Sequence, residues 1–485
     1  MLELLEEQFG RYLVDPIGAV LFFDIAFWDD RPGDPGLVLP LLVVWLIIGA
    51  TYFTLRFRFV NVRAFRHAID CVRGRYTRPD DPGEISHFQA LAAALSATVG
   101  LGNIAGVAVA VGIGGPGAVF WMVLAGALGM SSKFAECTLG QKYRIVRGDG
   151  HVSGGPMHYL RDGLAELRLP RFGRALAVVF AFMCIGGSLG GGNMFQANQS
   201  YQQVASVVPL LAGTGGSIAF GLALAFCVGL VIIGGIRRIG EVAAVIVPVM
   251  CAVYLLCGFW ILLSHAGELG GALLTIVHSA YRPDAAFGGF AGVLIQGFKR
   301  AAFSNEAGVG SAAIAHSAAA TPEPVREGLV ALLEPFIDTL VVCTMTGLVL
   351  VVTGAYAAPG VETGIAMTSW AFATVFPWFP VVLSLIAVLF AFSTMISWSY
   401  YGEQCWANLF GIRSILGYKL LFLTFVWLGA VFAAEKVIEF GDLMILGMAF
   451  PNMAGVFLLS GRVKADLDDY LARLRAGAFP RSDAR

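Results

Sequence analysis

The chain has 485 residues, of which 57% are hydrophobic and only 13% are charged, and its formal net charge is −1. Soluble domains carry about 25% charged residues, so this composition predicts a protein embedded in a lipid bilayer. We expect no nucleic-acid partner.

Long charge-free runs predict eleven transmembrane helices, because a helix needs about 20 apolar residues to cross a bilayer. The expected spans are residues 37–57, 87–113, 116–140, 175–203, 214–235, 241–263, 287–319, 328–353, 379–401, 416–434 and 441–460. The segments between them leave no room for a soluble domain. We therefore expect an all-α integral membrane protein.

Neither the N-terminus nor the cysteines indicate secretion or metal binding. Residues 1–7 are acidic and lack the basic start of a signal peptide. The eight cysteines are scattered, without a CxxC motif or a His/Cys cluster at metal-ligand spacing. We expect free and mostly buried thiols, and no organic cofactor.

The second span contains a glycine-rich interruption, Ala94-Leu-Ser-Ala-Thr-Val-Gly-Leu-Gly-Asn-Ile-Ala-Gly-Val107. A broken helix is tolerated at membrane depth only where protein or a water-filled cavity surrounds it. About 200 residues later, Asn305-Glu-Ala-Gly-Val309 echoes Asn103-Ile-Ala-Gly-Val107. A chance echo in an Ala/Gly-rich chain is the alternative, but two interrupted helices in corresponding halves are typical of a transport site.

Most basic residues lie in alternate loops of this topology. They cluster in residues 56–78, 142–174, 237–238, 326, 413–419 and 462–485, whereas Arg11, Arg31, Arg282 and Lys436 lie on the other side. The positive-inside rule makes the basic side cytoplasmic. The N-terminus is then outside and the C-terminus inside.

Eleven spans divide into one peripheral helix and ten core helices. The two broken spans are then the first and sixth core helices, and an offset of five spans inverts the second half relative to the first. The expected division is 1–84, an N-terminal segment with the peripheral helix and a basic loop; 85–263, the first five-helix repeat; 264–460, the second repeat; and 461–485, a cytoplasmic tail.

Several motifs resemble the alanine/glycine:cation symporter family along nearly the whole chain. They are Ser96-Ala-Thr-Val-Gly-Leu-Gly-Asn-Ile-Ala-Gly106, Gly192-Asn-Met-Phe-Gln-Ala-Asn198, Phe303-Ser-Asn-Glu-Ala-Gly308, Glu334-Pro-Phe-Ile-Asp-Thr-Leu-Val-Val-Cys-Thr344 and Ala391-Phe-Ser-Thr-Met-Ile-Ser-Trp-Ser-Tyr-Tyr-Gly402. The resemblance implies a sodium-coupled importer of alanine or glycine with the inverted-repeat fold of amino-acid symporters. Leu101 departs from the threonine that is frequent at its position.

The first break is the expected substrate site. An amino-acid carboxylate needs donors in a low-dielectric space, and the unwound backbone at Leu101, Gly102 and Asn103 followed by a helix N-terminus supplies them. Glycine at 100 and 102 lets a ligand approach the main chain. A dinucleotide-binding loop is excluded because no strand precedes the motif.

Polar and aromatic side chains elsewhere complete the predicted substrate pocket. Gln196 and Asn193, three residues apart on one helix, are expected to face it together, and Asn305 joins them through the echoed motif. The resemblance supports Trp398 as the wall at the substrate side chain, although an interfacial anchor is the alternative. A bulky wall above a glycine floor predicts a small substrate.

Sodium requires several hard oxygen ligands. Ser393 and Thr394 offer two hydroxyls in mid-span, although membrane hydroxyls commonly bond back to the preceding turn. The resemblance implies a sodium site formed by these two with the carbonyls of Ser96 and Val99. A second ion at the Thr98 carbonyl and Asn103 stays open, because Ala97 replaces the asparagine of symporters with two sites.

Ionisable residues within spans are functional candidates by default. Glu334 and Asp338 lie four residues apart and are expected to meet Arg or Lys as an inner gate or brace, with a proton relay as the alternative. Glu306, inside the second break, is expected to pair with Arg300 or to contact the substrate ammonium. His151 and His158 are interpreted as surface residues.

These features predict a secondary active transporter that imports alanine or glycine with sodium by alternating access. The expected location is a prokaryotic plasma (inner) membrane. Proton coupling is the alternative, and a channel is less favoured because no short repeated filter is visible. No motif of a membrane-bound hydrolase stands in the spans, so we expect no enzyme.

Overall fold

The computed structural model describes residues 8, 10–27, 38–148, 150–281, 289–432, 434–479 and 481. Arg31, Arg282, the acidic start at residues 1–7 and the chain end at 482–485, which the topology prediction uses, lie outside these residues. The regular structure of the described residues is helical except for one short hairpin, formed by β1 (Ile145–Val146) and β2 (Val152–Ser153).

The N-terminal half runs from a short helix to a long bent pair and then to four long helices. Its elements are α2 (Asp15–Leu21), α3 (Leu41–Arg56), α4 (Val60–Arg63), α5 (Phe65–Val72), α6 (His87–Thr98), η3 (Leu101–Asn103), α7 (Ala105–Gly114), α8 (Gly117–Lys142), β1 (Ile145–Val146), β2 (Val152–Ser153), α9 (Pro156–His158), η4 (Tyr159–Gly163), α10 (Leu164–Glu166), α11 (Pro170–Leu189), η5 (Gly190–Met194), α12 (Phe195–Val207), α13 (Thr214–Ile232) and α14 (Gly235–Ser264).

The C-terminal half contains a second interrupted helix. Its elements are α15 (Leu269–Tyr281), α16 (Gly289–Asn305), α17 (Ala312–His316), α18 (Pro324–Ala331), α19 (Leu333–Pro335), η8 (Phe336–Cys343), α20 (Thr344–Val352), α21 (Ile365–Ala373), α22 (Phe379–Phe410), α23 (Ile415–Val431), α24 (Ala434–Gly447) and α25 (Ala449–Arg475).

Eight helices in the described residues are long and apolar enough to cross a membrane, and the bent pair α6 and α7 makes a ninth. Helical segments lie at all eleven expected spans, but α3 has 16 residues and α16 has 17. The prediction of an all-helical membrane protein is confirmed. The count of eleven stays a prediction.

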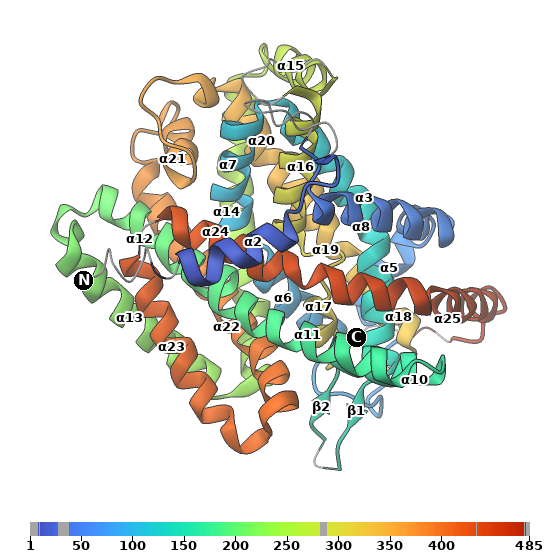
Figure 1. Cartoon of the computed structure of the whole chain (residues 1–485). Coiled ribbons are helices and arrows are strands. Elements are labelled where there is room, and N and C mark those ends of the chain that lie inside the picture. The colour runs from blue at the N-terminus through green and yellow to red at the C-terminus, as the bar shows by residue number, and fades with distance from the viewer. Residues whose placement is uncertain are drawn as a thin grey trace.

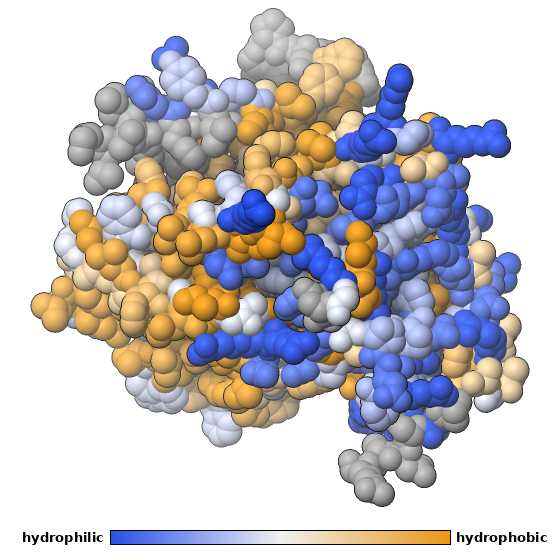
Figure 2. Space-filling view, turned by 90° about the horizontal axis from the view of Figure 1, so that it is seen from below, coloured by the Kyte–Doolittle hydropathy of each residue, from blue (hydrophilic) through white to orange (hydrophobic). Residues whose placement is uncertain are grey.

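The two ends of the molecule are visible in Figure 1, where α15 lies at the top and the β1–β2 hairpin at the bottom. Seen from below, Figure 2 shows hydrophilic residues gathered over one half of that face and hydrophobic residues over the other. Exposed apolar side chains of α13 and α23, among them Phe226, Leu222 and Leu416, are suited to contact lipid.

Two local features differ from the sequence-based expectations. His158 is not a surface residue: it is buried and bonded to Ser153 Oγ at 2.9 Å, and burial lowers its pKa to about 4. Helix α25 runs through residue 460, so the expected tail at 461–485 begins inside a helix.

Candidate functional site

The first break lies between α6 and α7, whose axes differ by 57°. Helix α6 starts at a capping box formed by Ser86 and Gln89 and ends at Thr98. The backbone is then extended at Gly100, whose amide bonds to Asn103 Oδ1 at 2.9 Å. The side chain of Asn103 therefore closes the loop between Gly100 and Asn103 with a hydrogen bond.

The second break follows α16, where Glu306 adopts φ +54° and Gly308 and Gly310 adopt +88° and +93°. A left-handed conformation costs a non-glycine residue about 1–3 kcal/mol, so Glu306 must be held by its surroundings. Its carboxylate accepts hydrogen bonds from Ser311 Oγ and, at 3.1 Å, from Trp398 Nε1. The break is thus tied to α22 through a buried carboxylate.

Asparagines of the two breaks bind adjacent residues of η8. Asn103 Nδ2 donates to Asp338 Oδ1 at 2.6 Å, and Asn305 Nδ2 donates to Thr339 Oγ1 at 2.9 Å. Asn305 Oδ1 also accepts from Ala307 N at 2.9 Å, as Asn103 Oδ1 accepts from Gly100 N. The asparagine of each echoed motif therefore bonds both to the backbone of its own break and to η8, and η8 contacts both breaks.

Gln196 meets the first break, whereas Asn193 does not. Gln196 Oε1 accepts from Leu101 N at 3.1 Å, but Asn193 Nδ2 donates to the Phe422 carbonyl of α23 at 2.8 Å. The spacing of three places residues on one face only in a regular α-helix. Asn193 lies in the π-helical segment η5, where the wider turn rotates it away from Gln196.

Trp398 is buried against the glycines of η5. A Cβ on Gly192 would lie 2.2 Å from Trp398 Cγ, so only glycine leaves space for this ring. The indole nitrogen is used by Glu306, which places Trp398 between η5 and the second break. It is therefore an interior residue and not an interfacial anchor.

The five predicted sodium ligands come from two helices: the end of α6 carries Ser96, Thr98 and Val99, and α22 carries Ser393 and Thr394. Ser96 Oγ donates to the Ser393 carbonyl at 2.6 Å, which joins α6 to α22. The Ser393 hydroxyl bonds back to Phe390 O at 3.0 Å. Thr394 Oγ1 is buried and has no hydrogen-bond partner in the described part of the chain, and a Cβ on Gly100 would lie only 2.4 Å from it.

One of the expected buried ion pairs, between Arg300 and Glu306, is not formed. Arg300 forms a bidentate pair with Asp442 of α24 at 2.9 and 2.7 Å, so it does not pair with Glu306. Glu334 does meet a lysine, since its Oε2 lies 3.3 Å from Lys133 Nζ of α8. Among the described residues, no ion pair joins Asp338 to a basic group.

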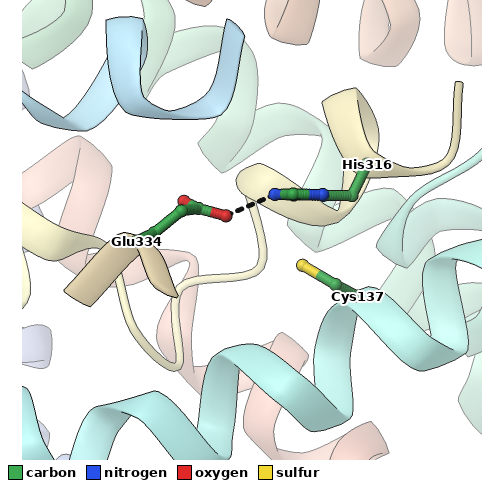
Figure 3. Close-up of side chains that lie close together, drawn as sticks. All are labelled: Cys137, His316 and Glu334. Atoms are coloured by element: carbon green, nitrogen blue, oxygen red, sulfur yellow. Dashed lines mark hydrogen bonds and ion pairs between the residues drawn. The ribbon is translucent and has the colours of Figure 1, made fainter. Parts of the chain in front are cut away.

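Cys137, His316 and Glu334 lie close enough together to raise the question of a metal site (Figure 3). However, both ring nitrogens of His316 are occupied: Nδ1 contacts Glu327 Oε1 and Nε2 contacts Glu334 Oε1, each at 2.5 Å. An imidazole flanked by two carboxylates uses both nitrogens as donors and has no lone pair left for a metal. The cluster is an ion-pair network.

This network continues to the start of the first broken helix, because His87 Nδ1 bonds to the second oxygen of Glu327. The parts of His87, His316 and Glu327 were not predicted from the sequence. A signal was available, since the two histidines stand at the outer ends of the two interrupted segments. A parallel backbone bridge between Ile85 and Ala319 brings these ends together.

Two interrupted helices that face each other, with unwound backbone between them and a core of polar side chains, define a secondary transporter. Comparison with known proteins then gives the family. Residues 34–484 match the model of the sodium:alanine symporter family, and the chain belongs to this family. It is therefore a membrane transporter for amino acids and not an enzyme.

The relatives cover almost the whole chain. The sodium/alanine symporter AgcS of Methanococcus maripaludis is 41% identical over 88% of this chain and 93% of its own length. The probable sodium/glutamine symporter GlnT of Bacillus subtilis is 35% identical over 91% of this chain and 90% of its own length.

Among solved structures, a substrate-bound outward-open state of a Na+-coupled sialic acid symporter superposes with a TM-score of 0.52 at 12% identity, covering 86% of each chain. At this low identity the likeness shows the helical fold alone.

Proposed function

We propose that this chain imports a small neutral amino acid, alanine or glycine, together with sodium by alternating access. The observation that carries the proposal is the Thr394 hydroxyl, which is buried, has no hydrogen-bond partner among the described residues and lies against the unwound backbone at Gly100. A buried polar atom without a partner costs about 1–3 kcal/mol, which a bound cation would offset.

In this proposal Thr394 and Ser393 supply hydroxyl oxygens and Ser96, Thr98 and Val99 supply carbonyls to the ion. Sodium is the co-transported substrate. The amino acid binds on the other side of the loop, where Leu101, Gly102 and Asn103 present the main chain and Gln196 orients it. Asn305 in the second break and Trp398 on α22 lie at the edges of this site. Asn193 contacts α23 instead, which argues against a direct contact between Asn193 and the amino acid.

The test uses the purified chain in proteoliposomes loaded with no amino acid. Radiolabelled alanine should enter rapidly under an inward sodium gradient and stay near background under a proton gradient alone or with neither gradient. Uptake driven by protons and indifferent to sodium would overturn the proposal. Flux without accumulation against a gradient would indicate a channel.

Proton coupling is the second candidate, and one observation favours it. The buried chain of His87, Glu327, His316, Glu334 and Lys133 joins the two broken segments to α8 and contains groups that exchange protons. The comparison of sodium and proton gradients above decides between the two ions.

The place of Trp398 in the proposed site predicts a size limit for the amino acid. Glycine and alanine should compete for uptake about tenfold or more better than leucine, phenylalanine or glutamine, because forcing extra methylenes against Trp398 costs about 1–3 kcal/mol. Trp398→Ala should narrow this difference and Trp398→Phe, the matched control, should keep it. Equal competition by large amino acids in the unmodified protein would refute the geometry.

The two broken helices also lead us to propose a transmembrane topology for the chain. Ten core helices form two inverted repeats, 85–263 and 264–460, after an N-terminal segment at 1–84 and before the tail at 461–485. The matching roles of Asn103 and Asn305 support this repeat. The basic loops lie in the cytoplasm, with the N-terminus outside, in the plasma membrane of a prokaryotic cell.

A further inference from the structure

A cavity away from the two breaks opens on the face that the proposed topology places in the cytoplasm. It lies between the β1–β2 hairpin and the turn that joins α22 to α23, and its volume is about 620 Å³. Figure 1 shows the hairpin and the start of α23 at the same end of the molecule. Sites for small molecules commonly have volumes of about 300–1,000 Å³, so the cavity can hold a ligand.

The described lining of this cavity is basic. Arg147 follows β1, Arg161 lies in η4 and Arg413 lies in the turn, whereas no Asp or Glu is among the described lining residues. A fourth ionisable group, His158, adds no charge at neutral pH, because burial lowers its pKa to about 4. The charge of the cavity therefore comes from the three guanidinium groups.

Only one of these three arginines is neutralised within the part of the chain that the structure describes. Arg161 donates from Nε and Nη2 to the two oxygens of Asp162 at 2.7 and 2.8 Å. Arg147 and Arg413 are both exposed, and neither forms an ion pair with a described residue. The cavity therefore presents two positive charges to an external anion.

The acidic side chains of the adjoining pocket, which shares Arg147, are held by other partners. Glu403 Oε2 lies 3.2 Å from Lys419 Nζ. Glu84 Oε1 accepts from a backbone amide of β2 at 2.6 Å, and its Oε2 lies 3.9 Å from Arg237 Nε. Since neither carboxylate pairs with Arg147, its guanidinium is available to a ligand.

One edge of the cavity is apolar and exposed. Phe410 and Ile412 line the cavity and are 52% and 55% exposed, and Leu416 in the first turn of α23 is 69% exposed. Phe410 also packs edge-on against the exposed Phe182 of α11, with ring centroids 6.4 Å apart. Exposed apolar side chains at the ends of membrane helices are suited to contact acyl chains. The basic cavity therefore adjoins a surface that faces lipid.

We propose that this cavity binds the phosphate headgroup of an anionic phospholipid of the cytoplasmic leaflet, with Arg147 and Arg413 as the residues that hold the phosphate. The acyl chains then lie along Phe410, Ile412 and Leu416. A guanidinium presents parallel N–H donors that match phosphate oxygens. Basic pockets between membrane helices on the cytoplasmic side are suited to such headgroups. The choice of leaflet rests on the proposed topology, whereas the binding itself is independent of the transported amino acid and ion.

The bound headgroup joins two segments that are distant in the sequence. Arg147 belongs to the hairpin that follows α8, and Arg413 follows the end of α22, the helix that carries Ser393 and Thr394. A ligand that requires both segments in place binds the folded chain and not the unfolded chain, so it raises the midpoint of thermal unfolding.

The experiment measures the dissociation constant of the first phospholipid that binds to the purified, delipidated chain in a neutral detergent, by native mass spectrometry. Phosphatidylglycerol, which is anionic, is compared with zwitterionic phosphatidylcholine of the same chain length. Each arginine contributes about fivefold to the affinity for an anionic headgroup, so we expect phosphatidylglycerol to bind about 25-fold more tightly. It should also raise the midpoint of thermal unfolding more than phosphatidylcholine does.

Three variants locate the site. Arg147→Gln and Arg413→Gln should each weaken the binding of phosphatidylglycerol about fivefold and leave that of phosphatidylcholine unchanged. Arg174→Gln is the matched control, because Arg174 is an exposed arginine of α11 on the same proposed cytoplasmic side, outside the cavity, and forms no ion pair with a described residue. It should leave the affinity for both lipids unchanged. All three side chains are exposed, so the variants should fold.

Three results would overturn the proposal. Equal affinities for the two lipids would exclude a site for an anionic headgroup. Equal losses for Arg174→Gln and Arg413→Gln would indicate general attraction to the basic face and not this cavity. Displacement of phosphatidylglycerol by inorganic phosphate at a similar concentration would assign the cavity to a small free anion, because phosphate lacks the acyl chains that the apolar edge contacts. None of these measurements involves alanine or sodium, so they leave the proposed transport function untouched.

Discussion

Replacing Ser393 and Thr394 together by alanine should raise the sodium concentration for half-maximal alanine uptake by about 100-fold or more. Each hydroxyl lost from a charged partner costs about 1.5–3 kcal/mol, which is about tenfold or more. The main-chain donors at Leu101 and Gly102 are untouched, so alanine affinity at saturating sodium should change little. Initial rates in proteoliposomes across a range of sodium concentrations measure both quantities.

Two variants control this result. Ser399→Ala removes a buried hydroxyl of the same helix that bonds back to Ile396 O at 2.7 Å, and it should leave the sodium dependence unchanged. Gly102→Val should do the opposite of the double variant, blocking the amino acid while sodium binding survives. If the double variant keeps its sodium dependence, the ion lies elsewhere, and Asp338 or Glu306 becomes the better candidate.

Lys133→Met should destabilise the folded protein by about 3–5 kcal/mol, because it leaves Glu136 buried without its lysine and leaves Glu334 with His316 as its remaining partner. Lys133 has no exposed surface, and α8 packs against η8, α16 and α18 around it. The midpoint of thermal unfolding in detergent should fall clearly below that of the unmodified chain.

A compensating variant identifies charge as the cause. Lys133→Met combined with Glu334→Gln removes one charge of each sign and should recover much of the lost stability. Lys464→Met provides the control outside the core, since its partner Asp468 on α25 is exposed and ion pairs at the surface contribute about 0–1 kcal/mol. Equal losses for Lys133→Met and Lys464→Met would contradict the assigned role of Lys133.

The sequence by itself determined the membrane architecture, the two breaks and the family. Apolar runs of spanning length and glycines at 100, 102, 308 and 310 are local properties, so they could be interpreted without knowing what each helix packs against. The same holds for the family motifs, which the match over residues 34–484 confirms.

Only the tertiary structure decided which polar groups meet. Arg300 pairs with Asp442, 142 residues away in the chain, and not with the nearby Glu306. Asn193 points away from Gln196 because η5 is π-helical, and the periodicity of the sequence does not predict this wider helical turn. His87 and His316 share Glu327 because a backbone bridge joins distant loops. Hydropathy and spacing describe the face that a residue occupies on its own helix, whereas its partner depends on how that helix crosses the others.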